Sequence, residues 1–142
     1  MFFSIQCSIL KSKPSLDDPI IDFYTKTPSQ RTQTVLTLVE TARDAIKARH
    51  QAYAIESLNR SISIEPTNPF PYFFLGFIYY EEQHYQKSTG FLSKAIDLFN
   101  PFPFWKAQTH LLLAKDWKMM GDQKLYDFHL QKAKHIDSSI SE

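Results

Sequence analysis

Apolar residues recur along this chain at the spacing of helices rather than of strands. In the stretch 68–81, four residues at i, i+3, i+4 and i+7 mark one buried helix face: Tyr72, Leu75, Gly76 and Tyr79. Asn68 is a favourable N-cap and Pro69 a favourable first helical residue. The polar run 81–84 then predicts a turn, and a second helix is marked by Tyr85, Leu92, Ala95, Ile96 and Leu98. No segment shows the alternation of a β-strand.

The same pattern of sizes repeats along the chain. A shift of 34 residues places Ala42 on Gly76, and a shift of 38 residues places Gly76 on Ala114. Small residues coincide with small ones, and large apolar residues with large apolar ones. A repeat of this length is typical of stacked structural units. The sequence therefore predicts three helix pairs, at about 27–66, 68–99 and 101–137.

Small residues explain how two helices in a pair can pack closely. Helices joined by a tight turn approach each other only where one of them lacks bulk. The first helices supply Ala42, Gly76 and Ala114, and the second helices supply Ala54, Ser61, Ser88, Ala95 and Ala133.

Local signals place the ends of the helices. Thr27-Pro28-Ser29-Gln30 matches the capping-box pattern and predicts the start of the first helix. Turns are expected near Arg49-His50 and Gly121-Asp122, and the last helix is expected to run to about Asp137. The motif Asn-Pro-Phe-Pro occurs at Asn68–Pro71 and at Asn100–Pro103. Each copy is expected to open the first helix of a pair.

Together these residues resemble the tetratricopeptide repeat. The central pair carries the resemblance through Leu75-Gly76, Tyr79, Tyr85, Ser88, Leu92, Ala95-Ile96 and Asn100-Pro101. It extends from about Thr27 to Asp137, with departures at Thr41, where the family has leucine, and at Tyr126, where it has a small residue. The resemblance implies an all-α, right-handed solenoid of three antiparallel helix pairs. A weaker similarity links the whole chain to small three-repeat proteins of the bacterial envelope, some of them lipoproteins.

The resemblance also implies a scaffold that binds peptides or partner segments on a concave face lined by the first helices. Helix spacing places twelve residues in this partner-binding groove: Leu36, Val39, Arg43, Ile46, Phe70, Phe73, Phe77, Tyr80, Gln108, Leu111, Lys115 and Lys118. The groove is expected to be aromatic in the middle and basic towards one end. Exposed aromatic patches mark binding sites. The alternatives are that the chain's own N-terminal arm covers the patch, or that the helix phase differs.

Some members of the family grip a C-terminal carboxylate with Lys, Asn and Arg on neighbouring first helices. Val39, Phe73 and Phe77 stand at such positions here, so this grip is not expected. Lys115 and Lys118 would favour an acidic segment, unless they only form a solvated face.

Composition narrows the function further. The chain of 142 residues and 16.6 kDa suits one domain that buries its core without disulfides or metal. A net charge of +1 argues against binding nucleic acid by charge. Three glycines leave little room for phosphate-binding loops, and the single cysteine, Cys7, excludes an internal disulfide. Aromatic residues are unusually frequent at 15%.

Residues 1–26 are interpreted as a flexible N-terminal arm. Pro14 and Pro19 interrupt it, and its apolar cluster is expected to dock on the protein's own body: Ile20, Ile21, Phe23 and Tyr24. Met1–Leu10 lacks the basic start of a signal peptide, and no run is long enough to span a membrane. The chain as written is therefore expected to be cytoplasmic. If the true start lies upstream, it would be periplasmic, or lipid-anchored near Cys7, in a bacterial envelope.

Histidines give no sign of catalysis. His50 and His84 fall in equivalent turns and are expected to be solvated, whereas His110 falls on a packed side. His129 and His135 lie on different faces of one helix. No His-Glu-x-x-His motif is present, and no acid–base pair has an evident reason to be buried. The sequence therefore predicts no catalytic, cofactor or metal site.

Two functions remain. The first is a non-enzymatic interaction module that binds a peptide or helix in the aromatic groove and so aids the assembly of a larger complex. The alternative is a structural or self-associating repeat protein whose groove is filled by its own arm. Repeat arrays need a covered or polar end, and only Ser138–Glu142 follows the third pair. Homodimerisation through the last helix, with Leu125, Phe128 and Ile136, is a further hypothesis.

Overall fold

The computed structural model describes residues 20 and 28–141. All regular structure in this part of the chain is helical, in six helices: α1 Gln30–Lys47, α2 Gln51–Ile64, α3 Pro69–Glu81, α4 Tyr85–Leu98, α5 Pro103–Met119 and α6 Gln123–Ile136. Within residues 28–141, no helix is both long and apolar enough to cross a membrane.

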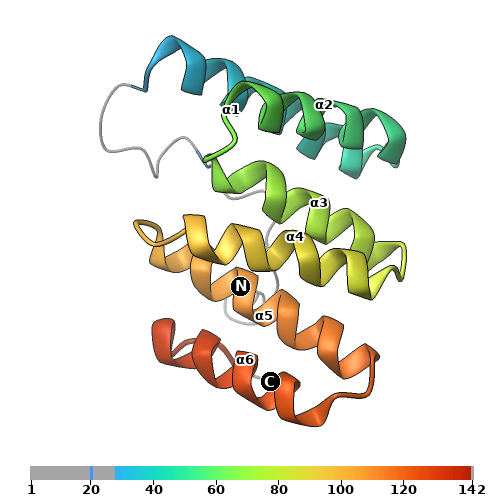
Figure 1. Ribbon diagram of the computed structural model, residues 1–142, viewed down its shortest axis with the longest axis vertical. Helices are drawn as coiled ribbons and strands as arrows, with labels where there is room; N and C mark the ends of the chain where they lie inside the picture. The colour runs from blue at the N-terminus through green and yellow to red at the C-terminus, as the bar shows by residue number, and fades with distance from the viewer. Residues whose placement is uncertain (1–19, 21–27, 142) are drawn as a thin grey trace, which may run out of the picture.

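The helices pack as three consecutive pairs. α1 packs on α2, α3 on α4, and α5 on α6, and the pairs stack through the contacts of α2 with α3 and of α4 with α5 (Figure 1). The first helices also meet, because α1 contacts α3 and α3 contacts α5. The expected all-α array of three helix pairs is confirmed.

Capping residues set where the helices begin. The Asn68 side chain accepts a hydrogen bond from the Phe70 N–H at 3.2 Å, and Pro69 opens α3, as expected. The capping box expected at the start of α1 is wrong in register. Ser29, and not Thr27, is the N-cap, because its hydroxyl accepts from the Thr32 N–H at 3.1 Å. Thr27 lies outside the described residues.

The two Asn-Pro-Phe-Pro motifs open helices in different registers. In the first copy the leading proline, Pro69, begins α3, whereas in the second copy the trailing proline, Pro103, begins α5. Asn100 does not cap a helix. Its amide nitrogen donates to the Asp97 carbonyl at 3.3 Å, and its amide oxygen accepts from Lys106 Nζ at 2.7 Å. The same four-residue motif therefore opens the two helices at different positions, because the side chain of Asn100 bonds to Asp97 and Lys106 and does not cap α5.

The three turns within pairs share one backbone feature. Arg49, Gln83 and Gly121 each have a positive φ, of 64°, 63° and 82°. This left-handed region suits glycine and is unfavourable for other L residues. Only the third turn uses glycine, so the first two turns contain local strain.

The crossing of α3 and α4 is close enough to require glycine. A Cβ atom on Gly76 would lie 2.5 Å from Leu92 Cδ2, far inside van der Waals contact. The Ser88 hydroxyl donates to the Gly76 carbonyl at 2.9 Å and so joins the two helices at the same point. The expectation that small residues permit close packing is confirmed here.

Aromatic side chains fill the main core, which runs from α1 to the start of α5. The Trp105 ring lies 5.2 Å from the Phe70 ring and 5.2 Å from the Phe73 ring, both edge-on, and stacks on Phe99 at 6.2 Å. Edge-to-face packing of this kind is favourable beyond the apolar area that it buries. Much of the high aromatic content is therefore structural.

A smaller core joins α5 to α6. Ile140, beyond the end of α6, is buried there with Leu111, Leu130 and neighbouring alanines. The described residues 137–141 form no helix, and Ile140 covers apolar surface at this end. Phe128 remains 50% exposed on α6, whereas Leu125 and Ile136 are partly buried. Homodimerisation through this helix stays a prediction.

Candidate functional site

The twelve residues expected to line the groove come from α1, α3 and α5, and we refer to them as the inner face. Eight of them are buried: Leu36, Val39, Arg43, Ile46, Phe70, Phe73, Gln108 and Leu111. Phe77, Tyr80 and Lys115 are partly buried, and Lys118 is exposed. The expected exposed aromatic patch is therefore wrong for its centre, because Phe70 and Phe73 have no exposed surface.

In two helices, a stretch of eight consecutive residues is buried on every side. Every residue from Ala107 to Ala114 in α5 is buried, and so is every residue from Pro69 to Gly76 in α3. A helix that packs only on neighbouring helices of a single layer keeps one polar, solvated stripe. Neither of these two stretches has such a stripe. Both stretches are therefore enclosed around their full circumference.

Ile20 is the one described residue of the N-terminal arm, and it is fully buried. It has 0% exposure and belongs to the main core, together with Val39, Phe73 and Trp105. Its burial was expected from the apolar cluster in the arm. The other members of that cluster, Ile21, Phe23 and Tyr24, lie outside the described residues, as does Cys7.

The cations of the inner face have distinct surroundings. Arg43 is buried, and its Nη1 pairs with Glu40 Oε1 at 2.8 Å while its guanidinium lies 5.4 Å from the centre of the Phe74 ring. Lys118 Nζ lies 5.3 Å from the centre of the Tyr126 ring. Of these charges only Lys118 is fully presented to solvent, so the basic end of the inner face is weak.

Gln108 is a buried amide without a partner in residues 28–141. Its side chain is 1% exposed, and neither Oε1 nor Nε2 makes a hydrogen bond there. An unpaired buried amide costs free energy, so native structures usually satisfy it. A glutamine amide offers one acceptor and two donor hydrogens, which match the N–H and C=O of an extended backbone.

A buried carboxyl joins three helices, and the sequence did not reveal it. Asp116 on α5 is fully buried, with Oδ2 at 2.6 Å from the Ser88 hydroxyl. Burial raises the pKa of Asp116 to about 7. Ser88 has one hydrogen to donate, and the Gly76 carbonyl also lies within reach at 2.9 Å. When Ser88 donates to Gly76, a protonated Asp116 donates to Ser88, and the three helices are joined without a buried charge.

A histidine pair joins α5 to α6, and sequence spacing did not indicate it either. The Nδ1 atoms of His110 and His129 lie 3.0 Å apart. Burial, and secondarily the neighbouring His129, lower the pKa of His110 to about 4, and burial lowers the pKa of His129. His50, His84 and His135 are exposed. Among the described residues, no group of three or more His, Cys, Asp or Glu side chains could hold a metal ion.

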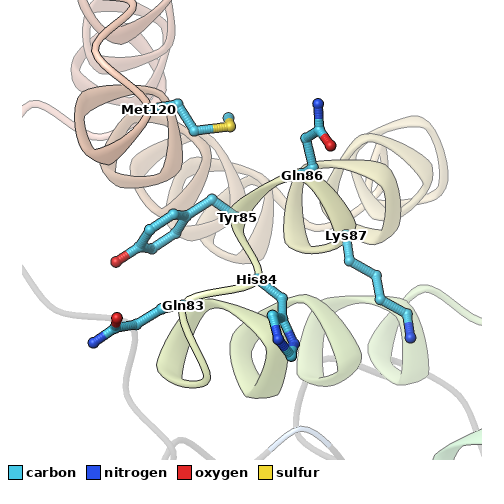
Figure 2. A pocket seen from close by; sticks show the side chains of 6 residues that line it. All are labelled: Gln83, His84, Tyr85, Gln86, Lys87 and Met120. Carbon is cyan, nitrogen blue, oxygen red and sulfur yellow. The ribbon is translucent and has the colours of Figure 1, made fainter.

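An open hollow lies outside the inner face, where the α3–α4 turn meets the end of α5. It holds about 570 Å³ and is lined by Gln83, His84, Tyr85, Gln86, Lys87 and Met120. Figure 2 shows the Tyr85 ring extending below Met120, with His84 and Lys87 directed away from that methionine. Four of its six lining residues are exposed polar or charged side chains: Gln83, His84, Gln86 and Lys87. It therefore offers a ligand few fixed groups.

Comparison with known proteins shows the fold. No protein-family model and no curated protein matches this sequence. Among solved structures, the chain is similar to the N-terminal domain of stress-induced protein-1 (STI-1) from C. elegans, with a TM-score of 0.72 and 15% identity. The match covers 78% of this chain and 89% of that chain. The six helices in three packed pairs have the tetratricopeptide-type fold, as the repeat pattern predicted.

Proposed function

We propose that this chain is a non-enzymatic protein-interaction module whose inner face binds an extended apolar segment of a protein partner. The burial of Ile20 carries the proposal. This residue lies outside the six helices, yet it is 0% exposed among side chains of the main core. The main core, to which α1, α3 and α5 contribute, thus accepts an apolar side chain from a segment that is not part of the helix array.

The chemistry of the inner face supports an apolar segment over a carboxylate. Val39 and Phe73 are buried apolar residues where a carboxylate grip needs amide or basic side chains. Burial of a large apolar side chain contributes roughly 1.5–3 kcal/mol, so several anchors are needed to reach the roughly 8 kcal/mol of micromolar affinity and to offset the cost of association. The unpaired Gln108 amide would add hydrogen bonds to the backbone of the bound segment.

The buried titratable groups are better explained as links between helices than as catalysts. Asp116 is fully enclosed between α4 and α5, and His110 is 7% exposed between α5 and α6. A general acid or base has to come within hydrogen-bond reach of its substrate. A substrate could not approach either group without separating two packed helices.

Site-specific photo-cross-linking tests the proposal. Benzoylphenylalanine would replace Phe77, a partly buried aromatic on the inner face, and in a matched variant Tyr53, which is 54% exposed on α2. After irradiation in the cell of origin, we expect a protein cross-linked at position 77 and absent at position 53. The partner segment should carry apolar residues at the cross-linked site.

Two results would contradict the proposal. One is the same set of products from positions 77 and 53, which would mark non-specific capture. The other is a reproducible partner at position 53 alone, which would move the working surface to α2. Circular dichroism must first show that both variants retain the helical content of the wild type.

A further inference from the structure

We propose, on the basis of the function above, that residues 1–27 are the resident occupant of the inner face, with Ile20 as anchor, so that a partner segment must displace them. The chain is then a self-inhibited interaction module. Ile20 belongs to the same hydrophobic core as the inner-face residues Val39, Phe70 and Phe73, and the proposal extends this association to the rest of the segment.

The reach of the segment fits this assignment. Ser29, the N-cap of α1, lies nine positions after Ile20 in the sequence. An extended chain of this length spans up to about 30 Å. Neighbouring helices lie roughly 8–10 Å apart, so α1, α3 and α5 together present a face about 20 Å across. The segment is therefore long enough to cross all three first helices.

The burial pattern fits such an occupant. Helix spacing placed Val39 on α1 and Phe73 on α3 on the inner face, and both side chains are 0% exposed. Both belong to the same hydrophobic core as Ile20. Within the described residues, Ile20 joins this core from a position that precedes all six helices and the turns between them. An occupant supplied by the same chain explains why these side chains are buried.

The sequence of the segment suits an extended occupant. Pro14 and Pro19 disfavour helix, and the residue that precedes each proline is restricted to extended backbone. Two aspartates, Asp17 and Asp18, precede the apolar cluster, and Lys118 is exposed at one end of the inner face. A segment with apolar anchors and acidic residues beside them matches a face that is apolar in the middle and has one exposed cation, Lys118, at one end.

Peptide competition in the full chain tests the inference. The probe is a fluorescent peptide with the sequence of residues 14–27, and its binding is followed by fluorescence anisotropy. In the wild type the resident segment should exclude the probe. Ile20→Ala removes most of the anchor, so this variant should bind the probe at least tenfold more tightly than the wild type. Ile20→Leu keeps the apolar volume and should behave like the wild type.

The inference is overturned if folded Ile20→Ala and wild type take up the probe equally, or if neither takes it up. If Ile20→Ala loses helical circular dichroism, a diazirine amino acid at position 20 of the full chain replaces it. Cross-links to α1, α3 or α5 of the same chain would support the inference. Cross-links to other surfaces, or to a second copy with a yield that rises with concentration, would overturn it.

The two proposals fail separately. A partner captured at position 77 equally well in wild type and in Ile20→Ala would overturn self-inhibition and leave the interaction module standing. Uptake of the 14–27 probe by Ile20→Ala, with no partner captured from the cell in either form, would support the resident segment and count against the partner function.

Discussion

At the scale of single residues, buried polar groups inside the stack differ in how many of their atoms are paired. Asp116 pairs its Oδ2 with Ser88 between α4 and α5, while its Oδ1 has no hydrogen-bond partner in residues 28–141. His110 meets His129 between α5 and α6. Gln108 has neither amide atom paired in residues 28–141. A buried polar group of this kind lowers stability unless a ligand uses it, which makes it a test of function.

Gln108→Leu should therefore stabilise the free chain and weaken the partner complex. The unpaired amide disappears, so the free energy of unfolding in urea should rise by about 1–3 kcal/mol. Capture of a partner through position 77 should fall about tenfold, because the hydrogen bonds to its backbone are lost. Gln86→Leu, at an exposed position of α4, is the matched control and should change neither. A stabilised variant with undiminished capture would show that Gln108 takes no part in binding.

Glycines 76 and 90 offer a second residue-scale comparison. A Cβ on Gly76 meets Leu92 Cδ2 at 2.5 Å, whereas a Cβ on Gly90 meets nothing within 4 Å. Gly76→Ala should destabilise by about 1–3 kcal/mol through overpacking. Gly90→Ala, in an exposed helix interior, should stabilise by about 0.5–1 kcal/mol. Urea denaturation measures both, and equal effects would mean that α3 and α4 are not closely packed.

At the scale of elements, the three pairs share one turn geometry but not one turn sequence. The positive φ values at Arg49, Gln83 and Gly121 allow each second helix to return along the first. Asp122 then caps α6, accepting from the Leu125 N–H at 2.9 Å, whereas the His50 and His84 side chains form no cap. The third turn thus has both a glycine at the positive φ and a side-chain cap. The first two turns lack both, so substitutions there can raise the stability of the protein.

Exchanging residues at these turns should move stability in opposite directions. Gln83→Gly relieves the left-handed strain and should raise the free energy of unfolding by several tenths to about 1 kcal/mol. Gly121→Ala introduces the same strain, with nothing within 4 Å to clash, and should lower stability by about 1 kcal/mol. Thermal denaturation followed by circular dichroism measures both changes. Loss of stability in Gln83→Gly would show that its side chain contributes more than the strain costs.

At the scale of the whole molecule, two buried groups make stability depend on pH in opposite directions. Folded Asp116 keeps its proton up to about pH 7, whereas an unfolded carboxyl loses it near 3.8. Its contribution is therefore full below pH 3.8 and is lost as the pH rises through 7. Folded His110 stays neutral down to about pH 4, whereas an unfolded histidine is protonated near 6.5. Its contribution is present above pH 6.5 and is lost as the pH falls towards 4.

In the wild type, the pH dependences that Asp116 and His110 give to the free energy of unfolding have opposite slopes and should largely cancel between pH 4 and pH 6.5. Asp116→Asn removes one slope, and its stability relative to the wild type should rise with pH by up to about 1.4 kcal/mol per pH unit. His110→Gln removes the other, and its relative stability should fall as the pH rises. Urea unfolding at pH 4.5, 5.5 and 6.5 measures these differences. Parallel curves for both variants and the wild type would refute the burial-driven shifts.

The sequence by itself determined the helices and how closely they pair. Helical spacing, the Asn68 cap and the small residue at Gly76 are local signals, and the structure confirms each of them. These features need only neighbours within one helix or across one tight turn. The start of a helix is harder to predict where two residues could each serve as N-cap. Thr27 and Ser29 compete in this way before α1, and the choice of Ser29 moves the start of the helix by two residues.

Only the tertiary structure decided what the inner face is. Helix spacing brought Phe70 and Phe73 to that face, but their burial depends on side chains that pack on them from later elements, such as Phe99 and Trp105. The contacts of Asp116 with Ser88 and of His110 with His129 join residues 28 and 19 positions apart on different helices. Periodicity reports which side of a helix is apolar. It carries no information on which distant segment meets that side, because this depends on how all the elements stack.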